Sequence, residues 1–261
     1  MRKWVLGIGL ILLAYSCRTP DTTLKIAATT IPHAELLRFI QEDLIHQGVN
    51  LKIIEVDDYT LPNRMVQEGD VDANFFQHQS FLDEEIRMHG YDLMPLTAVH
   101  IEPLGIYSLV YRSIDAIKNG SKVAIPQDPT NEARALLLLQ DIGLIKIRKS
   151  IANLNCITPL DIIENPQHLK FEELDASYLV RGLSDVDLSI IPSNFALQGK
   201  LNPLRDPIAV ECIDHRYANI VVIKPKDLNK ENFQKLKQAL NTDKLRLFIE
   251  EKYRGSILPS F

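Results

Sequence analysis

Cysteine is scarce in this 261-residue sequence, which contains only Cys17, Cys156 and Cys212. No two of them have the short spacing of a metal-ligand set, so the sequence excludes a cysteine-based metal site. Cys156 and Cys212 lie far apart in the sequence, and sequence alone does not show whether their side chains meet. Free thiols are the favoured interpretation, and one disulfide in an oxidising compartment is the alternative.

The sequence also lacks an excess of positive charge. Its 29 Lys and Arg residues are outnumbered by 34 Asp and Glu residues, which gives a formal net charge of -5. Nucleic-acid-binding surfaces are basic, so neither DNA nor RNA is an expected partner. The sequence contains no nucleophile elbow, phosphate-binding loop or zinc-helix motif, and no pair of carboxylates is spaced for acid–base work. We therefore expect no enzymatic activity and no cofactor.

The apolar run at residues 4–14 falls short of the roughly 20 residues that a membrane-spanning helix requires. It follows Arg2 and Lys3 and precedes Cys17, an arrangement typical of a secretory signal peptide. We expect residues 1–16 to be this signal and residues 17–23 to be a linker. Cys17 resembles the lipid-attachment site of bacterial lipoproteins, which predicts an exported protein held on a membrane by fatty acids such as palmitate, facing the periplasm or the cell exterior. An uncleaved anchor or a plain secretory signal is the alternative.

One pattern of residues occurs twice in the remaining sequence. In the first half it comprises residues 25–35, 55–57 and 70–76, and in the second half residues 122–132, 173–175 and 185–191. Each copy predicts a short apolar strand, a helix and further strands. Two such copies predict an α/β protein with two lobes that face one another across a cleft, where a small molecule can be held.

Turn and capping signals delimit the first elements of each copy. In the first copy we expect a strand at 24–29, a helix that has Pro32 in its first turn and stops at Gly48, and a parallel strand at 51–56. In the second we expect a strand at 122–125 and a helix with Asp128 as N-cap, Pro129 at its first position and Gly143 at its end. Residues 143–169 are extra in the second copy and predict a surface insertion or a short added helix.

Two strand-like runs are suited to carry the chain between the lobes, at residues 103–111 on the way out and 218–223 on the way back. Two amphipathic helices follow and are expected to pack on the first lobe. The predicted division is therefore a discontinuous lobe one (24–108 and 218–261) and an inserted lobe two (109–217), joined by a double-stranded hinge.

Polar residues lie where predicted strands turn into helices, the place where open parallel sheets bind ligands. Residues 128–131 (DPTN) open a helix whose free N–H groups suit an anion, and Arg134 one turn later can offer a planar fork to a carboxylate. An ion pair between Arg134 and Glu132, or another neighbouring acid, explains Arg134 equally well. Residues 74–78 (NFFQH) place two aromatic rings beside an amide and an imidazole, although core packing accounts for one of the two rings.

Several longer motifs resemble the methionine-binding lipoproteins of bacterial ABC importers. They are DVDANFFQH (70–78), GYDL (90–93), HIEP (100–103), AIP (124–126), DPTNE (128–132), RALLLLQ (134–140) and IEEKY (249–253). The resemblance covers residues 24–261. It implies a two-lobed type II periplasmic-binding-protein fold without catalysis, which delivers L-methionine or a related amino acid to an ABC permease driven by a separate ATPase subunit.

The same resemblance implies a set of ligand-binding residues: Tyr59, Phe75, Phe76, His78, Arg134, Asn194 and Asn219. The aromatic side chains would hold the thioether, Arg134 the α-carboxylate and Asn219 the α-amino group. This chain has Pro192 where family members commonly have an asparagine, and Asn194 is the residue expected to replace that amide. It also has Thr30 or Ile31 where the family often has a glycine.

Two other functions remain open at the level of sequence. Because of Pro192, a lipoprotein of this fold with a changed amino-acid ligand, or with no transport role, is one alternative. A metal-binding receptor is a weaker one, in which His33, His78 and His100 would converge with Glu102. No metal site is predicted, because these residues lack the short spacing of metal ligands.

Overall fold

The structure is a computed structural model that describes residues 23–150 and 153–261. The predicted signal peptide, Cys17 and nearly all of the predicted linker lie outside these residues. Among the described residues, no helix combines the length and the apolar character needed to cross a membrane.

The first lobe is built on a six-stranded mixed sheet in the order β13-β4-β12-β3-β1-β2. Its strands are β1 (Thr23–Thr29), β2 (Asn50–Val56), β3 (Ala73–His78), β4 (Met94–Ile101), β12 (Ala218–Ile223) and β13 (Leu258–Pro259). Strand β1 runs parallel to β2 and β3, whereas β12 is antiparallel to both β3 and β4. The sheet therefore contains strands from both ends of the described chain.

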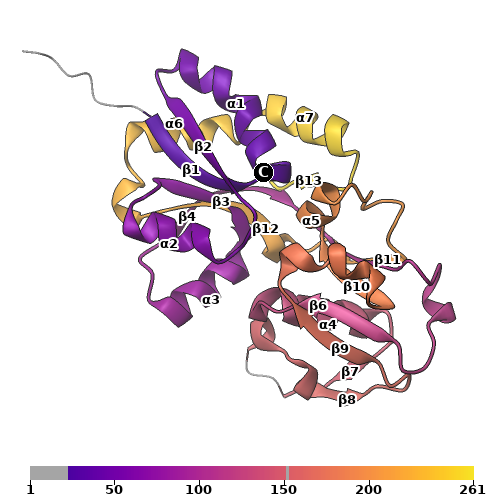
Figure 1. Ribbon diagram of the computed structural model, residues 1–261. Coiled ribbons are helices and arrows are strands. Elements are labelled where there is room, and N and C mark those ends of the chain that lie inside the picture. The colour runs from indigo at the N-terminus through magenta and orange to yellow at the C-terminus, as the bar shows by residue number, and fades with distance from the viewer. Residues whose placement is uncertain (1–22, 151–152) are drawn as a thin grey trace, which may run out of the picture.

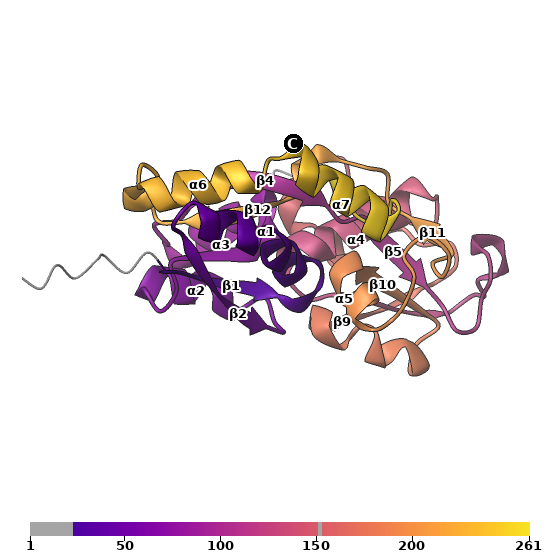
Figure 2. The same ribbon diagram turned by 90° about the horizontal axis from the view of Figure 1, so that it is seen from above.

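Five α-helices belong to this lobe: α1 (Glu35–His46), α2 (Leu61–Glu68), α3 (Gln79–His89), α6 (Glu231–Ala239) and α7 (Asp243–Tyr253). Helix α1 buries Leu36, Leu37 and Ile40 in one core with Leu236 of α6 and Ile249 of α7. The prediction that the two C-terminal helices pack on the first lobe is thus confirmed, and Figures 1 and 2 show both of them on that lobe, together with α1.

The second lobe has a five-stranded sheet in the order β11-β5-β10-β6-β9. The strands are β5 (Leu104–Tyr107), β6 (Lys122–Pro126), β9 (Lys170–Leu174), β10 (Leu188–Pro192) and β11 (Ala209–Val210), and the helices are α4 (Pro129–Asp141) and α5 (Ser193–Gln198). Helix α4 is buried along most of its length. Its Asp128 N-cap accepts a hydrogen bond from the Asn131 N–H, as the sequence predicts.

Short segments complete the fold. The irregular helical segment η1 is Thr30–Ala34, and the 3-10 turns are Ile114–Ala116, Leu154–Cys156, Pro159–Asp161, Ala176–Tyr178, Arg181–Ser184, His215–Tyr217 and Pro225–Asp227. Strands β7 (Lys146–Ile147) and β8 (Ile162–Glu164) form a small antiparallel pair in the extra region of the second copy. The described residues of this region therefore form a small two-stranded sheet with short turns and no added α-helix. Cys156 and Cys212 are free thiols.

The two sheets repeat one topology, which confirms the predicted duplication. In lobe one the first strand of the copy, β1, lies between β2 and β3, and in lobe two β6 lies between β9 and β10. In each sheet the third strand of the copy then pairs antiparallel with a strand beside a lobe crossing, β12 or β5. The carboxyl ends of the parallel strands in both lobes point toward the space between them (Figure 1).

Pro32 opens the first helical turn, as predicted: Ile31 is extended (φ -128°, ψ 131°), and residues 32–34 are already helical and lead directly into α1 at Glu35. One predicted boundary differs from the structure. The outward crossing comes at Glu102 and Pro103, since β4 belongs to the first sheet and β5 to the second. The predicted boundary after residue 108 therefore lies too late in the chain, whereas the return crossing before β12 coincides with the expected residue 218.

Candidate ligand-binding site

A small cavity lies between the lobes. Ten residues line it: Tyr59, Phe76, Gln77, His78, Phe81, Glu102, Asn131, Arg134, Pro192 and Asn219. The volume of this cavity is only about 20 Å3, so the two lobes are closed upon one another here. An amino acid can enter only if the lobes or the lining side chains move apart.

A larger cleft of about 710 Å3 lies beside the inner cavity and shares Tyr59 and Phe81 with it. Acidic side chains from both lobes border it, among them Glu84 and Glu85 of α3 and Glu173 and Asp175 of the second lobe. Tyr59 and Phe81 therefore border both the inner cavity and this outer cleft.

Aromatic rings form one wall of the inner cavity. Phe76 at the end of β3 and Phe81 in the first turn of α3 meet edge to face, with centroids 5.6 Å apart. Tyr59 lies 5.7 Å from Phe76 and also packs 5.1 Å from Phe195 of α5, across the lobe boundary. Three rings at this spacing give an apolar and polarisable surface, which suits a thioether or another apolar side chain.

His78 joins the two lobes beside these rings. Its Nδ1 accepts the Phe81 N–H (3.2 Å), which caps α3, so Nε2 carries the proton and donates to Asn131 Oδ1 (3.2 Å) on α4. Burial, followed by the nearby charge of Arg134, lowers the pKa of His78 to about 3. The imidazole is therefore a neutral hydrogen-bond group at physiological pH.

Arg134 is buried at the centre of the site, and one edge of its guanidinium is already occupied. Nε and Nη2 donate to the Glu211 carboxylate at 2.6–3.0 Å, and Nη2 also donates to the main-chain oxygen of Glu102 (2.7 Å). The Tyr217 ring stacks on the guanidinium, 4.2 Å from its centroid. None of these hydrogen bonds uses Nη1. A ligand carboxylate can therefore bind only the Nη1 edge of the guanidinium, because the edge formed by Nε and Nη2 is taken by Glu211.

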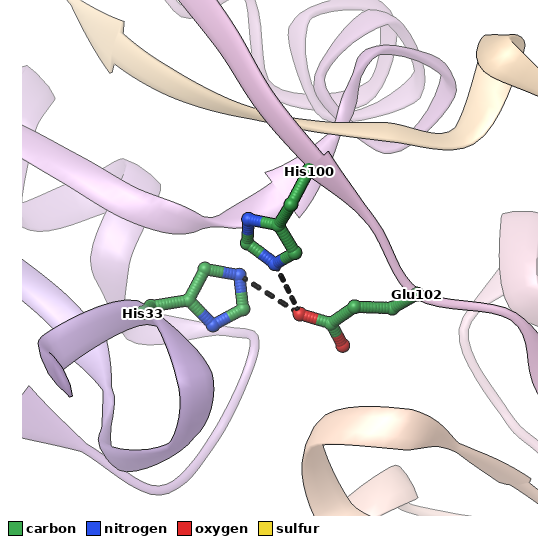
Figure 3. Close-up of side chains that lie close together, drawn as sticks. All are labelled: His33, His100 and Glu102. Carbon is green, nitrogen blue, oxygen red and sulfur yellow. Dashed lines mark hydrogen bonds and ion pairs between the residues drawn. The ribbon is translucent and has the colours of Figure 1, made fainter. Parts of the chain in front are cut away.

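Glu102, which lines the cavity, forms a compact cluster with two buried histidines (Figure 3). His100 Nε2 lies 2.7 Å and His33 Nε2 lies 3.3 Å from Glu102 Oε1. His33 Nε2 also faces Asn219 Oδ1 at 3.0 Å, so this nitrogen carries the proton and its Nδ1 accepts from Thr29 Oγ1 (2.6 Å). Burial lowers the pKa of His33 to about 4 and that of His100 to about 3, so both rings are neutral near pH 7.

Glu102 also crosses to the second lobe. Its Oε2 accepts the main-chain N–H of Asn194 (3.1 Å) in the first turn of α5. The Asn194 side chain turns the other way and accepts the Tyr59 hydroxyl through Oδ1 (2.8 Å). Asn194 Nδ2 is buried without a hydrogen-bond partner, and Pro192, which has neither an N–H nor an amide, lines the cavity nearby.

The structure brings five of the seven predicted residues to the cavity wall: Tyr59, Phe76, His78, Arg134 and Asn219. Asn194 lies just behind Tyr59. Phe75 is placed elsewhere, in the core of lobe one against His33 (4.6 Å), because adjacent residues on a strand face opposite ways.

The other five lining residues are not among the predicted ligand contacts: Gln77, Phe81, Glu102, Asn131 and Pro192. The position of Glu102 directly after the β4 segment was the available signal, since ligands collect at strand ends.

Comparison with known proteins places the chain in a family. Residues 24–261 match the profile of the family described as NlpA lipoprotein. The chain belongs to this family.

Relatives of this NlpA-family chain include the D-methionine-binding lipoprotein MetQ of Salmonella typhi, which is 41% identical over 210 residues, with 80% of this chain and 77% of that protein covered. Among solved structures, a nutrient binding protein from Burkholderia cenocepacia bound to methionine superposes with a TM-score of 0.88 at 40% identity and covers 91% of this chain and 100% of its own. A periplasmic substrate-binding protein of an ABC transporter from Coxiella burnetii gives 0.85 at 35% identity, covering 90% and 99%.

These similarities confirm the predicted lipoprotein family and the two-lobed binding-protein fold. The matched proteins are binding proteins for transport, so the NlpA-family chain is a substrate-binding protein and not an enzyme.

Proposed function

We propose that this protein captures methionine in the cavity between its lobes and delivers it to the permease of an ABC importer. The observation that carries the proposal is the pairing of an aromatic wall, formed by Tyr59, Phe76 and Phe81, with the buried cation Arg134 in one interlobe cavity. A thioether suits the rings, and an α-carboxylate suits the guanidinium.

The closed geometry supports capture by lobe motion. Tyr59 and His78 of lobe one already bond to Asn194 and Asn131 of lobe two, and the space between them is too small for an amino acid. A ligand that touches both lobes stabilises the closed arrangement by its contacts with each, which is the population shift expected of a hinged receptor. The closed form is then the one presented to the permease and its ATPase subunit.

Calorimetric titration of L-methionine, and separately of D-methionine, tests the proposal. The chain should start after Cys17 and be unfolded and refolded beforehand, so that ligand carried from the cell is removed. One-to-one binding at sub-micromolar concentration is expected, which corresponds to about 8 kcal/mol or more. Absence of heat and of any thermal shift with both enantiomers would overturn the assignment of methionine.

We also propose that Cys17 carries the lipid that holds the exported protein on the membrane. The membership of the chain in a lipoprotein family and the short apolar run before Cys17 support this anchor. Labelling of growing cells with a fatty-acid analogue should mark the wild-type protein and leave Cys17→Ser unmarked; equal labelling of both would place the lipid on another residue.

The cluster of His33, His100 and Glu102 favours metal capture as the second candidate, because one ligand atom from each lies within 4.8 Å of the others. Two ligands of one tetrahedral zinc ion lie about 3.3 Å apart, given bonds of about 2.0 Å. The 2.7 Å between His100 and Glu102 is instead a hydrogen-bond distance, and His78, which the metal hypothesis included, bonds to Asn131. Hydrogen bonding therefore accounts for the cluster, and methionine remains the proposal.

A further inference from the structure

We propose that the carboxylate of Glu102 is the counter-ion of the ligand's α-ammonium group, so that the cavity selects α-amino acids over the corresponding hydroxy acids. This inference rests on the proposed function and names a residue that determines its specificity.

Glu102 lies on the cavity wall close to Arg134. Glu102 lines the inner cavity together with Arg134, Asn219 and Pro192, and its side chain is only about 6% exposed. It stands at the crossing between the lobes, with Oε2 bonded to the Asn194 N–H of lobe two. A ligand whose carboxylate meets Arg134 therefore has an acidic group on the same cavity wall.

Glu102 is a buried acid whose ion-pair partners among the described residues are two histidines. A buried carboxylate is costly unless a cation or several donors compensate it. The two imidazoles beside Glu102 are neutral, as their lowered pKa values show, and Arg134 gives its Nε and Nη2 to Glu211 and reaches only the main-chain oxygen of Glu102. No Lys or Arg side chain in the described part of the protein forms an ion pair with the Glu102 carboxylate. An ammonium group in the cavity supplies the missing positive charge.

The hydrogen-bond shell of the Glu102 carboxylate is incomplete. A carboxylate offers about four acceptor positions. His100 and the Asn194 N–H donate to two of them, and His33 Nε2, which donates to Asn219, lies 3.3 Å from Oε1, so at least one position remains for a donor from the cavity. Asn219, the residue expected to receive the amino group, already accepts from His33 through Oδ1. Pro192 contributes no acceptor side chain, so Glu102 is the anionic acceptor on this wall.

The roles of the two histidines follow from the same contacts. His100 donates to Glu102 Oε1, His33 Nε2 lies 3.3 Å from the same oxygen, and Phe75 packs 4.6 Å from His33 and 5.4 Å from His100. They are positioning residues that fix the orientation of the carboxylate.

The test compares methionine with its hydroxy analogue, in which a hydroxyl replaces the α-ammonium, on the wild-type protein and on Glu102→Gln. The glutamine keeps the shape and one acceptor oxygen but removes the charge. Methionine binding should weaken at least about 30-fold, as expected for loss of one partner of a buried charge pair, while binding of the hydroxy analogue changes less than about threefold. Glu132→Gln is the matched control, since Glu132 is equally buried and does not line the cavity; both affinities should stay as in the wild type.

Equal weakening of both ligands by Glu102→Gln would show that Glu102 acts only through its tie to Asn194, and unchanged methionine binding would show that another group meets the ammonium; either result overturns the inference. If Glu102→Gln does not fold, Glu102→Asp replaces it, because aspartate keeps the charge but withdraws it by one methylene, and the loss should again be confined to methionine.

The proposed function and this inference fail separately. If the wild type binds another α-amino acid instead of methionine, the methionine assignment falls, and the same comparison with that amino acid and its hydroxy acid decides the role of Glu102. If the wild type binds no α-amino acid at all, both are overturned.

Discussion

Lobe one and lobe two each have a turn before the third strand of the copy, and the same pair of hydrogen bonds closes both turns. Before β3, Asp72 accepts the Lys25 N–H through Oδ2 at 2.8 Å and returns its own N–H to the Lys25 carbonyl. Before β10, Asp187 makes the same two bonds with Lys122, the first also at 2.8 Å. The repeated Asp-Val-Asp motif thus ties the third strand of each copy to the start of the first.

The lobes differ where these strands end. Lobe one presents aromatic rings and the neutral imidazole of His78 to the cavity, and lobe two presents Arg134 and Asn131 from a capped helix. The residues that the two copies share build the scaffold, whereas those that they do not share face the ligand. Substitutions of the unshared residues should therefore affect ligand binding, and substitutions of the shared residues should affect stability.

The largest effect is expected from Arg134→Ala, which removes the only Arg or Lys among the described residues that line the inner cavity. Methionine binding should weaken by about a thousandfold or more, since loss of a buried charge partner costs several kcal/mol. Titration calorimetry measures the loss. Affinity equal to that of the wild type would refute the role of Arg134 in carboxylate binding.

This variant also leaves Glu211 without its partner, so stability and binding must be separated. The double variant Arg134→Ala/Glu211→Gln removes the unpaired carboxylate and should regain most of the melting temperature lost by Arg134→Ala. It should still not bind methionine. Recovery of binding in the double variant would show that Arg134 serves only to neutralise Glu211.

The second prediction concerns pH, because the strongly shifted groups of the two lobes respond in opposite directions. Burial lowers the pKa of His33 from 6.5 to about 4, so the unfolded chain binds a proton first and lobe one loses stability as pH falls below 6.5. Since one pKa unit corresponds to about 1.4 kcal/mol, His33 alone lowers the free energy of unfolding by about 3 kcal/mol when the pH falls to 4. Burial, with Glu173, Asp128 and Asp161 nearby, raises the pKa of Glu132 in lobe two from 4.5 to about 7. Ionisation of this buried carboxyl therefore destabilises the folded protein as the pH rises above 4.5.

Native-state hydrogen exchange, corrected for the intrinsic effect of pH, distinguishes the lobes. Between pH 7 and pH 4.5, amides of β1 and α1 should become easier to open, whereas those of β6 and α4 should not. Glu132→Gln should raise the melting temperature at pH 8 and leave it unchanged at pH 4. Equal acid loosening of both lobes would contradict this assignment of the titrating groups.

Local signals in the sequence were sufficient for much of the fold. The Asp128 cap and the positive φ of Gly48 and Gly143 depend on neighbouring residues, so the sequence could indicate them. Residues 104–107 join the second sheet because they pair with strands that are distant in the sequence. Local signals do not contain this information, so the sequence predicts the end of the first part of lobe one too late in the chain.

The candidate site also depends on contacts between distant residues, which the sequence alone does not reveal. From the sequence, Arg134 is either free for a ligand or paired with a neighbouring acid, whereas its partner in the structure, Glu211, lies 77 residues away in the chain. A pair of adjacent phenylalanines indicates that one faces the core, but the sequence does not reveal that this one is Phe75. Glu102 reaches the cavity because the chain crosses between lobes there, a feature set by both sheets together.

The smallest effect is expected from the shared scaffold, and it tests whether the two copies use their repeated aspartates alike. Asp72→Ala and Asp187→Ala each remove one charge-assisted hydrogen bond of 2.8 Å at a half-buried turn. Each should cost about 1 kcal/mol, or about 2–4 °C in melting temperature, without changing methionine affinity. Asp70→Ala is the control, because the Asp70 carboxylate makes no hydrogen bond or ion pair with the described residues. If only one of the two aspartates matters, then the motif repeats in sequence while its structural role belongs to a single lobe.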